Sequence, residues 1–363
     1  MSAATVALLV AGAAAWGVTQ KQRPGPPAAP DVVAEVFGGL PAQLRPPARV
    51  TDLPADHGVG SAALMYHRAV DADSFNPVSR TFEQNDVYLV TRSGEHFRVG
   101  RTPPDTGPLN LSLSPDGRWL GGKRDGRWWL RDLSAVTEYE VPEEHELLRW
   151  STDGRSALLG KPGTAWTFST MALPGGTVRQ LTVALPPAAA VVAFIAGREL
   201  AVFDPKPLLV GSAPHEVAVT LKDILTGEGR ALPVVVPGQL GPGEVAGPFA
   251  LIHGGGSPPS IWVEVGRPDL VPTSAPEGML VAPSVALLGV DVASGVAAGR
   301  IEIAPSGAGG RQLCRGVVAD GVVVQRETGV GTELLVIDPR RSVRRLVTTF
   351  PESVTVLAPG ATT

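Results

Sequence analysis

The chain has 363 residues, of which 44% are hydrophobic and 18% charged, and its formal net charge is −4. This length and apolar content suffice for one large all-β domain or two average domains, and the acidic balance excludes the basic face typical of nucleic-acid-binding proteins. The single cysteine, Cys314, excludes an intramolecular disulfide. Because its flanks resemble a strand, we interpret it as a small buried hydrophobe.

The N-terminal residues 1–20 carry no charged side chain and are mostly apolar. A helix of this length is just long enough to cross a bilayer. A Pro-rich run over 23–30 follows and prefers extended geometry. We expect a short apolar helix over 1–20 that anchors the protein, a linker over 21–47 and a folded body over 48–363. A cleaved secretory signal, indicated by Ala13, Ala14 and Ala15, and an apolar tail without a targeting role remain alternatives.

Two short phrases recur along the body. Residues 114–118 read Ser-Pro-Asp-Gly-Arg and residues 151–155 read Ser-Thr-Asp-Gly-Arg, so that Asp116 and Asp153 are 37 positions apart. Both are copies of the first phrase. The second phrase is an aspartate that ends a strand-like run and is followed by turn residues. It occurs four times, with Asp132, Asp223, Asp291 and Asp338. Repeats of this length, built from short strands, predict a β-propeller.

Taken in chain order, the alternating apolar runs and turn residues divide the body into six units. The first has strands at 62–70, 87–91 and 95–99, and lacks a fourth. The next five span residues 109–141, 146–183, 191–236, 244–303 and 313–350. Within the fifth unit, residues 254–280 look like an insertion rich in Gly, Pro and Ser. The C-terminal strand at 353–357 could complete the first unit and close the ring, which would leave no open sheet edge. We therefore expect an all-β fold, a single β-propeller of six four-stranded blades, with seven blades as the alternative.

Residues 114–120 resemble the turn motif of TolB-type and WD-repeat propellers. The repeated aspartates resemble the end of the third strand in such blades, where Trp-Asp often stands. The tryptophan is absent here, so the chain is more similar to the degenerate, TolB-like class. The resemblance covers residue 48 to the C-terminus. It implies a propeller fold and a tendency to bind partners, and it transfers no catalytic residues to this chain. We expect Asp116, Asp153 and the aspartates of the second phrase to cap backbone N–H groups in turns.

The candidate catalytic and metal motifs are incomplete. His253 and the three glycines after it look like an esterase oxyanion hole, but no Gly-x-Ser-x-Gly elbow accompanies them. Residues 154–161 depart from P-loop spacing, and residues 71–76 lack the glycine and distal glutamate of an EF-hand. Residues 143–146 (Glu-Glu-His-Glu) are interpreted as a solvated loop. The other histidines form no zinc-binding pair: His57, His67, His96, His145 and His215.

We therefore expect no catalytic, cofactor-binding or metal-binding residues. Five tryptophans are expected to pack between blades, with a stacking surface for sugar or peptide as the alternative: Trp119, Trp128, Trp129, Trp150 and Trp166. The sequence favours a monomeric, non-enzymatic propeller, anchored by one membrane pass on the extracytoplasmic side, that binds a protein or peptide partner on a propeller face. Two alternatives remain: a lactonase- or lyase-like propeller enzyme with a site in the central channel, and a soluble cytoplasmic interaction protein. Secretion is an alternative to the anchor.

Overall fold

The computed structural model describes most of the body of the chain. The described residues are 49–68, 75–76, 81–82, 84–102, 110–185, 189–203, 217–236, 238–246, 252–255, 259–267, 284–303, 312–318, 321–328, 330–338 and 343–360. The apolar segment at 1–20 and the linker at 21–47 lie outside these residues, so the anchor stays a prediction. Within the described ranges, no helix is long and apolar enough to cross a membrane.

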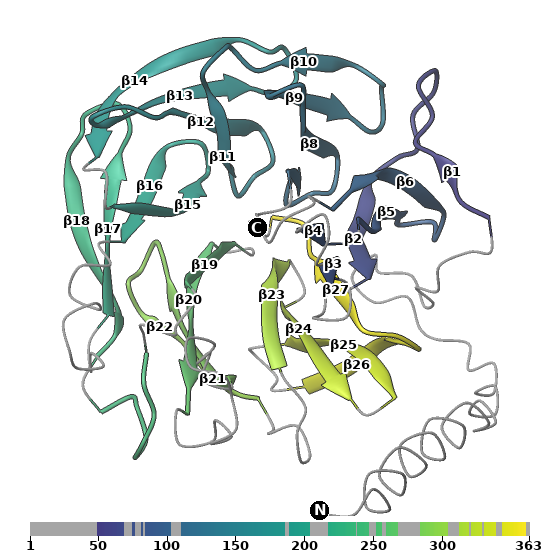
Figure 1. Ribbon diagram of the computed structural model, residues 1–363. Coiled ribbons are helices and arrows are strands. Elements are labelled where there is room, and N and C mark those ends of the chain that lie inside the picture. Colours follow the sequence, from purple (N-terminus) through teal and green to yellow (C-terminus); the bar gives the residue numbers. More distant parts are fainter. Residues whose placement is uncertain are drawn as a thin grey trace, which may run out of the picture. The chain divides into compact units, whose positions relative to one another are not determined.

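Six sheets follow one another along the chain and form a ring of blades (Figure 1). The first blade has five strands, in the order β1-β6-β5-β2-β27. Its strands are β1 (Thr51–Asp52), β2 (Ala62–Arg68), β5 (Asp86–Thr91), β6 (His96–Arg101) and β27 (Val354–Leu357). The C-terminal strand β27 pairs antiparallel with β2 and so closes the ring, as predicted. A separate hairpin is formed by β3 (Phe75–Asn76) and β4 (Thr81–Phe82).

The other five blades are four-stranded meanders in chain order. The second blade contains β7 (Leu111–Leu113), β8 (Trp119–Arg124), β9 (Arg127–Asp132) and β10 (Glu138–Glu140). The third contains β11 (Glu146–Trp150), β12 (Ser156–Lys161), β13 (Trp166–Ala172) and β14 (Val178–Leu185). The fourth contains β15 (Ala190–Ile195), β16 (Glu199–Phe203), β17 (Val217–Asp223) and β18 (Gly229–Val235). The fifth contains β19 (Ile252–Gly255), β20 (Ser260–Gly266), β21 (Ser284–Asp291) and β22 (Ala297–Glu302). The sixth contains β23 (Gln312–Val318), β24 (Gly321–Thr328), β25 (Gly331–Asp338) and β26 (Val343–Phe350). The expectation of six blades rather than seven is confirmed.

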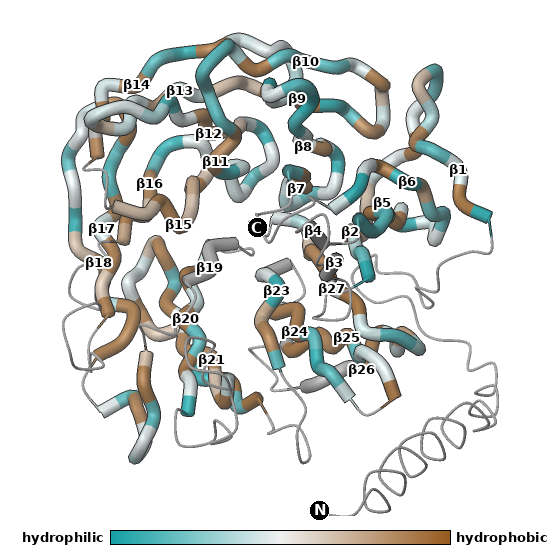
Figure 2. Tube along the Cα trace, in the orientation of Figure 1, coloured by the Kyte–Doolittle hydropathy of each residue, from teal (hydrophilic) through white to brown (hydrophobic). Residues whose placement is uncertain are grey.

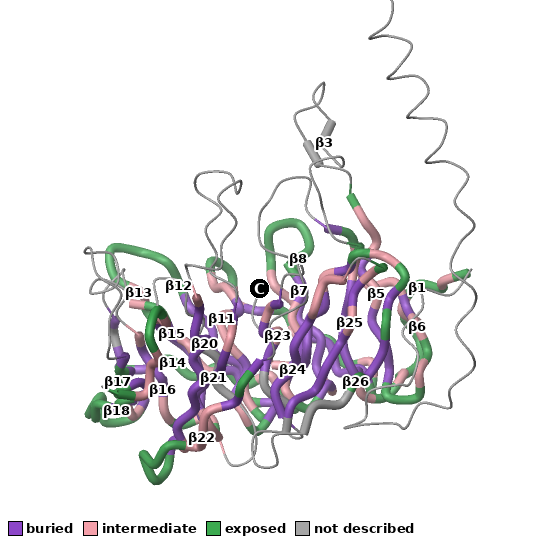
Figure 3. The backbone as a smooth tube through the Cα atoms, turned by 90° about the horizontal axis from the view of Figure 1, so that it is seen from below, coloured by how far each residue is buried: buried purple, intermediate pink, exposed green. Residues whose placement is uncertain are grey.

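The interior consists of apolar layers between neighbouring blades. Among the described residues there are six hydrophobic clusters, and each joins two adjacent sheets. Figure 2 shows the hydrophobic stretches in β21 and β24, and Figure 3 shows buried strands with exposed connecting turns. Trp119 and Trp150 are 1% and 5% exposed and pack in the cluster between the second and third blades, as expected of tryptophans in blades.

Buried polar side chains reinforce the ring closure. The Gln325 side chain on β24 donates to the Val354 carbonyl over 2.7 Å and accepts from the Val356 N–H over 3.1 Å. The Thr332 hydroxyl accepts from the Val354 N–H over 3.1 Å. These bonds satisfy backbone groups of β27 that would otherwise be buried without partners, and they tie the last strand of the chain to the sixth blade.

The fifth blade corrects one expectation. Residues 254–280 were expected to be an insertion, but the strand β20 (Ser260–Gly266) lies inside this range and pairs with both β19 and β21. Ile261, Val263 and Val265 are each 0% exposed, because they pack in the hydrophobic cluster between the fourth and fifth blades. The burial of these three side chains makes β20 part of the blade and not of a surface loop.

The Ser-x-Asp-Gly-Arg phrase forms the same capped turn twice. The Asp116 carboxylate accepts from the Ser114 hydroxyl over 2.5 Å and from the Arg118 N–H over 3.1 Å. The Asp153 carboxylate accepts from the Ser151 hydroxyl over 2.6 Å and from the Arg155 N–H over 3.1 Å. The expected capping role of both aspartates is confirmed.

Replacement of either turn aspartate should therefore lower stability without changing partner binding. We expect Asp116→Ala and Asp153→Ala each to cost about 0.5–2 kcal/mol, the usual cost of losing a side-chain cap. Urea unfolding of each variant measures this loss. An unchanged midpoint together with loss of a ligand would contradict the capping role and make the turns a binding site.

Candidate functional site: an arginine-rich cleft between the first two blades

The cleft forms where the chain passes from the first blade to the second. The strand β1 pairs in parallel with the start of β6, Thr51 opposite Phe97 and Asp52 opposite Arg98, and the Leu53 N–H donates to the Arg98 carbonyl over 3.0 Å. Beyond Leu53 the chain forms no further pairs with β6, and the Pro54 carbonyl accepts from Arg131 of the second blade instead. The chain then leaves β6 and reaches the second blade, where the Val59 N–H donates to the Leu133 carbonyl over 2.7 Å. We call residues 53–60 the crossing segment.

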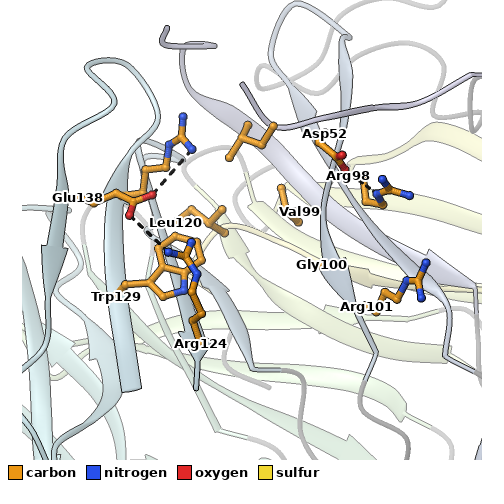
Figure 4. Close-up of a pocket in the computed structure, with 11 residues that line it drawn as sticks. Asp52, Arg98, Val99, Gly100, Arg101, Leu120, Arg124, Trp129 and Glu138 are labelled. Carbon is orange, nitrogen blue, oxygen red and sulfur yellow. Dashed lines mark hydrogen bonds and ion pairs between the residues drawn. The ribbon is translucent and has the colours of Figure 1, made fainter. Parts of the chain in front are cut away.

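The cleft between β6 and the face of the second blade has a volume of about 460 Å³ (Figure 4). It is lined by residues of β1, β6, β8, β9, β10 and the crossing segment: Asp52, Leu53, Arg98, Val99, Gly100, Arg101, Leu120, Arg124, Trp129, Arg131 and Glu138. Four of these are arginines and two are acidic, so the lining has an excess of positive charge. Such an excess favours an anionic ligand.

The carboxylates leave the arginines incompletely neutralised. Asp52 accepts from the Arg98 Nε over 2.6 Å, and this hydrogen bond lowers the pKa of Asp52. Asp86, just outside the lining, pairs with Arg101 at 3.2 Å and with Arg98 at 3.7 Å. Even with Asp86 counted, the cleft retains one positive charge in excess. Arg124 and Arg131, on the second blade, lie farther from their acidic partner.

Arg131 is the most buried of the four arginines, at 7% exposed. It donates a hydrogen bond to the Pro54 carbonyl of the crossing segment. Its Nη1 lies 3.9 Å from Glu138, and its Nε is buried without a hydrogen-bond partner among the described residues. The buried Nε is closed to solvent and so to a ligand, and Arg131 therefore contributes its positive charge to the cleft without a free donor at Nε.

Arg124 and Trp129 form the outer part of the second-blade wall. The Arg124 guanidinium lies over the Trp129 ring, 5.4 Å from its centroid, and its Nη1 is 4.0 Å from Glu138. Figure 4 shows Glu138 between Arg124 and a second arginine, which is Arg131. The Glu138 carboxylate is thus shared by the guanidinium groups of Arg124 and Arg131, at 4.0 and 3.9 Å. The arrangement can hold a further carboxylate or phosphate group, and Trp129 offers it an apolar surface beside the charge.

The residues selected from sequence lie elsewhere. Asp132, Asp223 and Asp291 accept backbone N–H bonds in their own turns, over 2.8, 2.8 and 2.7 Å to Ser134, Leu225 and Ser294, so their expected capping role is confirmed. Asp338 and His253 lie in strands, but their side chains fall outside the described residues, as do residues 71–74 and His215.

The structure also describes the surroundings of Cys314 and of the loop at 143–146. Cys314 is 3% exposed, and burial raises its pKa, which confirms a buried residue. Glu143 pairs with Arg127 at 2.9 Å and Glu144 pairs with Lys161, both at exposed positions, as expected of a solvated loop. Within the described ranges, no cluster of His, Cys, Asp or Glu could hold a metal ion.

The sequence contained no specific signal for the cleft. Arg131 precedes the aspartate of the second repeated phrase, at the place taken by Val290 in the fifth blade and Ile337 in the sixth. Those two residues are 3% and 1% exposed. The fourth blade has a cation at the same place, the half-buried Lys222 before Asp223, so an arginine there does not by itself mark a cleft.

No family model matches this chain, and no curated protein matches it. Among solved structures, TolB from Acinetobacter baumannii is 13% identical, with 83% of this chain and 68% of that chain covered and a TM-score of 0.44. A putative TolB from Agrobacterium tumefaciens is 13% identical, with 82% and 99% covered and a TM-score of 0.40. An oligogalacturonate lyase in complex with manganese is 13% identical, with 81% and 83% covered and a TM-score of 0.41. The solved structures similar to this chain thus include a TolB and a putative TolB.

Proposed function

We propose that the chain is a non-enzymatic β-propeller that binds an acidic region of a partner protein in the cleft between its first two blades. The observation that supports this most directly is the charge of the lining, in which four arginines face two carboxylates and Glu138 stands 4.0 Å from Arg124 and 3.9 Å from Arg131. A bound carboxylate would add a second negative charge beside these two guanidinium groups. The net positive lining and the exposed Arg124 and Arg101 would attract it.

We propose in addition that the N-terminal segment 1–20 tethers the propeller at the cell envelope, on the extracytoplasmic side. Its support is the run of 20 residues without a charged side chain and the Pro-rich spacer that follows. If the full chain is released from membranes by an alkaline wash, the tether is wrong. The proposed binding in the cleft does not depend on this tether.

The binding role predicts a specific pattern among charge variants. A fluorescent hexaglutamate peptide is titrated into the full chain, purified in detergent, and its anisotropy is measured. Arg124→Glu should weaken binding about tenfold, because it reverses an exposed charge at the cleft. Glu138→Gln should tighten binding roughly threefold, because it removes the internal carboxylate that competes for Arg124 and Arg131.

Arg179→Glu is the matched control, since Arg179 is an exposed arginine on β14 of the third blade, away from the cleft. It should leave the affinity unchanged. If hexaglutamate does not bind, or if all three variants change its affinity equally, the cleft is not the binding site and the proposal fails.

A further inference from the structure

The apolar residues of the lining come from both walls of the cleft. Leu53, Val99 and Trp129 are partly buried and pack on the hydrophobic cluster between the first two blades. Figure 4 shows Val99 on one wall and Trp129, with Leu120, on the other. Leu120 is 0% exposed, so the apolar surface that a ligand can reach belongs to the other three residues. The charged groups of the cleft therefore flank an apolar surface.

Two glycines shape this apolar surface. Gly122 on β8 pairs with Trp129 on β9, and a Cβ at Gly122 would lie 2.3 Å from Trp129 Cζ2. The indole ring therefore lies against the bare backbone of β8, which fixes its place in the wall. Gly100 on β6 lines the cleft without a side chain. A cleft of about 460 Å³ with an apolar surface and a few charged groups has the usual size and character of a ligand pocket.

The lining selects its occupant in two ways. Four arginines against two carboxylates favour a negatively charged segment. Leu53, Val99 and Trp129 favour an apolar side chain, because contact with one removes more of their surface from water. A uniformly acidic segment would satisfy the arginines and leave this apolar surface wet. A large apolar residue with acidic neighbours satisfies both.

The linker that precedes β1 carries an aromatic residue of its own. Phe37 follows Glu35, but the next acidic residue after it is Asp52, so its acidic flank is on one side only. Exposed arginines stand on both walls of the cleft, Arg101 on β6 and Arg124 on β8, with side chains 62% and 65% exposed. An aromatic residue with acidic neighbours on both sides matches this arrangement, so a segment of another protein fits the cleft better than the linker.

We propose that the partner segment carries an aromatic residue flanked on both sides by Asp or Glu. The ring packs on Leu53, Val99 and Trp129, and the flanking carboxylates contact Arg101 and Arg124. Contact between two aromatic rings contributes beyond the buried area, which favours an aromatic side chain beside Trp129. The apolar anchor supplies affinity, and the arginines supply the preference for acidic neighbours. This inference rests on the proposed function and adds the kind of acidic segment that the cleft selects.

Peptides of equal charge test the apolar anchor. The full chain in detergent is titrated with two fluorescent heptapeptides, one with Phe between two runs of three Glu and one with Ser in the place of Phe. Anisotropy measures both affinities. We expect the Phe peptide to bind about tenfold more tightly, because partial burial of an aromatic side chain contributes about this much. Equal affinities for the two, both reduced by Arg124→Glu, would overturn the apolar anchor and leave charge-based binding in the cleft.

Variants locate the preference for Phe. Trp129→Ser should reduce it, because it removes surface on which the ring packs, and Leu53→Ser tests the same contact from the crossing segment without changing a blade. Arg124→Glu should weaken both peptides and leave the preference as it is. Val178→Ser is the matched control, since Val178 is an exposed apolar residue on β14 of the third blade. A preference for Phe that survives both Trp129→Ser and Leu53→Ser would place the ring outside the cleft and overturn the inference.

A peptide of residues 31–40 separates the partner from the chain's own linker. We expect it to bind more weakly than the Phe heptapeptide. Binding as tight as that of the heptapeptide would assign the cleft to the linker and overturn the partner segment. If no peptide binds, or if binding ignores Arg124→Glu and Glu138→Gln, the proposed function fails and the inference fails with it.

Discussion

Gly117→Ala should be one of the most destabilising single substitutions in this propeller. Gly117 has a φ of +70°, where a Cβ costs about 1–2 kcal/mol. A Cβ at this position would also lie 2.0 Å from the carbonyl oxygen of Ala62, a buried residue at the start of β2. The Gly117 carbonyl accepts the Ala62 N–H over 2.7 Å, so the clash falls on a backbone contact between the first two blades. Overpacking adds about 1–3 kcal/mol, and we expect a total loss of roughly 2–5 kcal/mol in urea unfolding.

Two other glycines provide matched controls. Gly126 has a φ of +81° in the Asp125-Gly126 turn, and a Cβ there would meet nothing within 4 Å. Gly126→Ala should therefore show the conformational cost alone. Gly154→Ala should fall between the two, because its Cβ would lie 2.8 Å from the movable Asp116 side chain. Equal urea-unfolding midpoints for the Gly117 and Gly126 variants would contradict the prediction. They would mean that the backbone contact between Gly117 and Ala62 can shift without a loss of stability.

The turns and most strands of this fold can be predicted from sequence because their determinants are local. Asp125 and Gly126 both have positive φ, as an Asp-Gly hairpin pair requires, and the two Ser-x-Asp-Gly-Arg turns form from side chains within five residues. Ring closure by β27 also follows from sequence, since a leftover C-terminal strand and an incomplete first blade leave one reasonable pairing.

Among the strands that escape this reasoning, β20 and β1 do so for different physical reasons. The strand β20 is buried on both faces, and the Gly- and Pro-rich residues around it dominate the local composition, so it is recognised only once it lies between β19 and β21. The strand β1 is two exposed residues long and has no pattern of its own. It exists because the backbone of β6 offers it a partner.

The cleft depends on the same long-range information. Arg98 comes from the outer part of the first blade, whereas Arg124 and Arg131 come from the middle strands of the second, and only the packing of the blades brings them together. Sequence can show that Arg131 stands at a repeat position that is apolar in the fifth and sixth blades and basic in the fourth. It cannot show that the Pro54 carbonyl contacts this arginine, because that contact joins residues 77 positions apart.

Glu264 is a second charged residue in an apolar environment, and its protonation should control stability. It lies on β20 and is 3% exposed, and its Oε1 accepts from the Cys314 N–H over 2.7 Å. Burial raises its pKa from the ordinary 4.5 to about 7, against the opposing effects of the hydrogen bonds from Cys314 and Ser284 and the charge of Arg315. In the unfolded chain the carboxyl ionises near pH 4.5, whereas in the folded chain it holds its proton until about pH 7. Folding is therefore penalised progressively as the pH rises through this window, and the full penalty applies above it.

We expect Glu264→Gln to be more stable than the parent protein at pH 8, by roughly 3 kcal/mol, since each unit of pKa shift corresponds to about 1.4 kcal/mol. The Gln amide oxygen can still accept the Cys314 N–H, and the amide never ionises. The advantage should shrink as the pH falls from 7 and vanish near pH 4, where Glu264 is protonated in both states. Urea unfolding of both proteins at pH 4, 6 and 8 measures this difference, with Glu228→Gln as a control at an exposed turn. A Gln variant less stable than the parent at pH 8 would show that the folded blade requires the ionised carboxylate, held by Cys314 and Arg315 in spite of its burial.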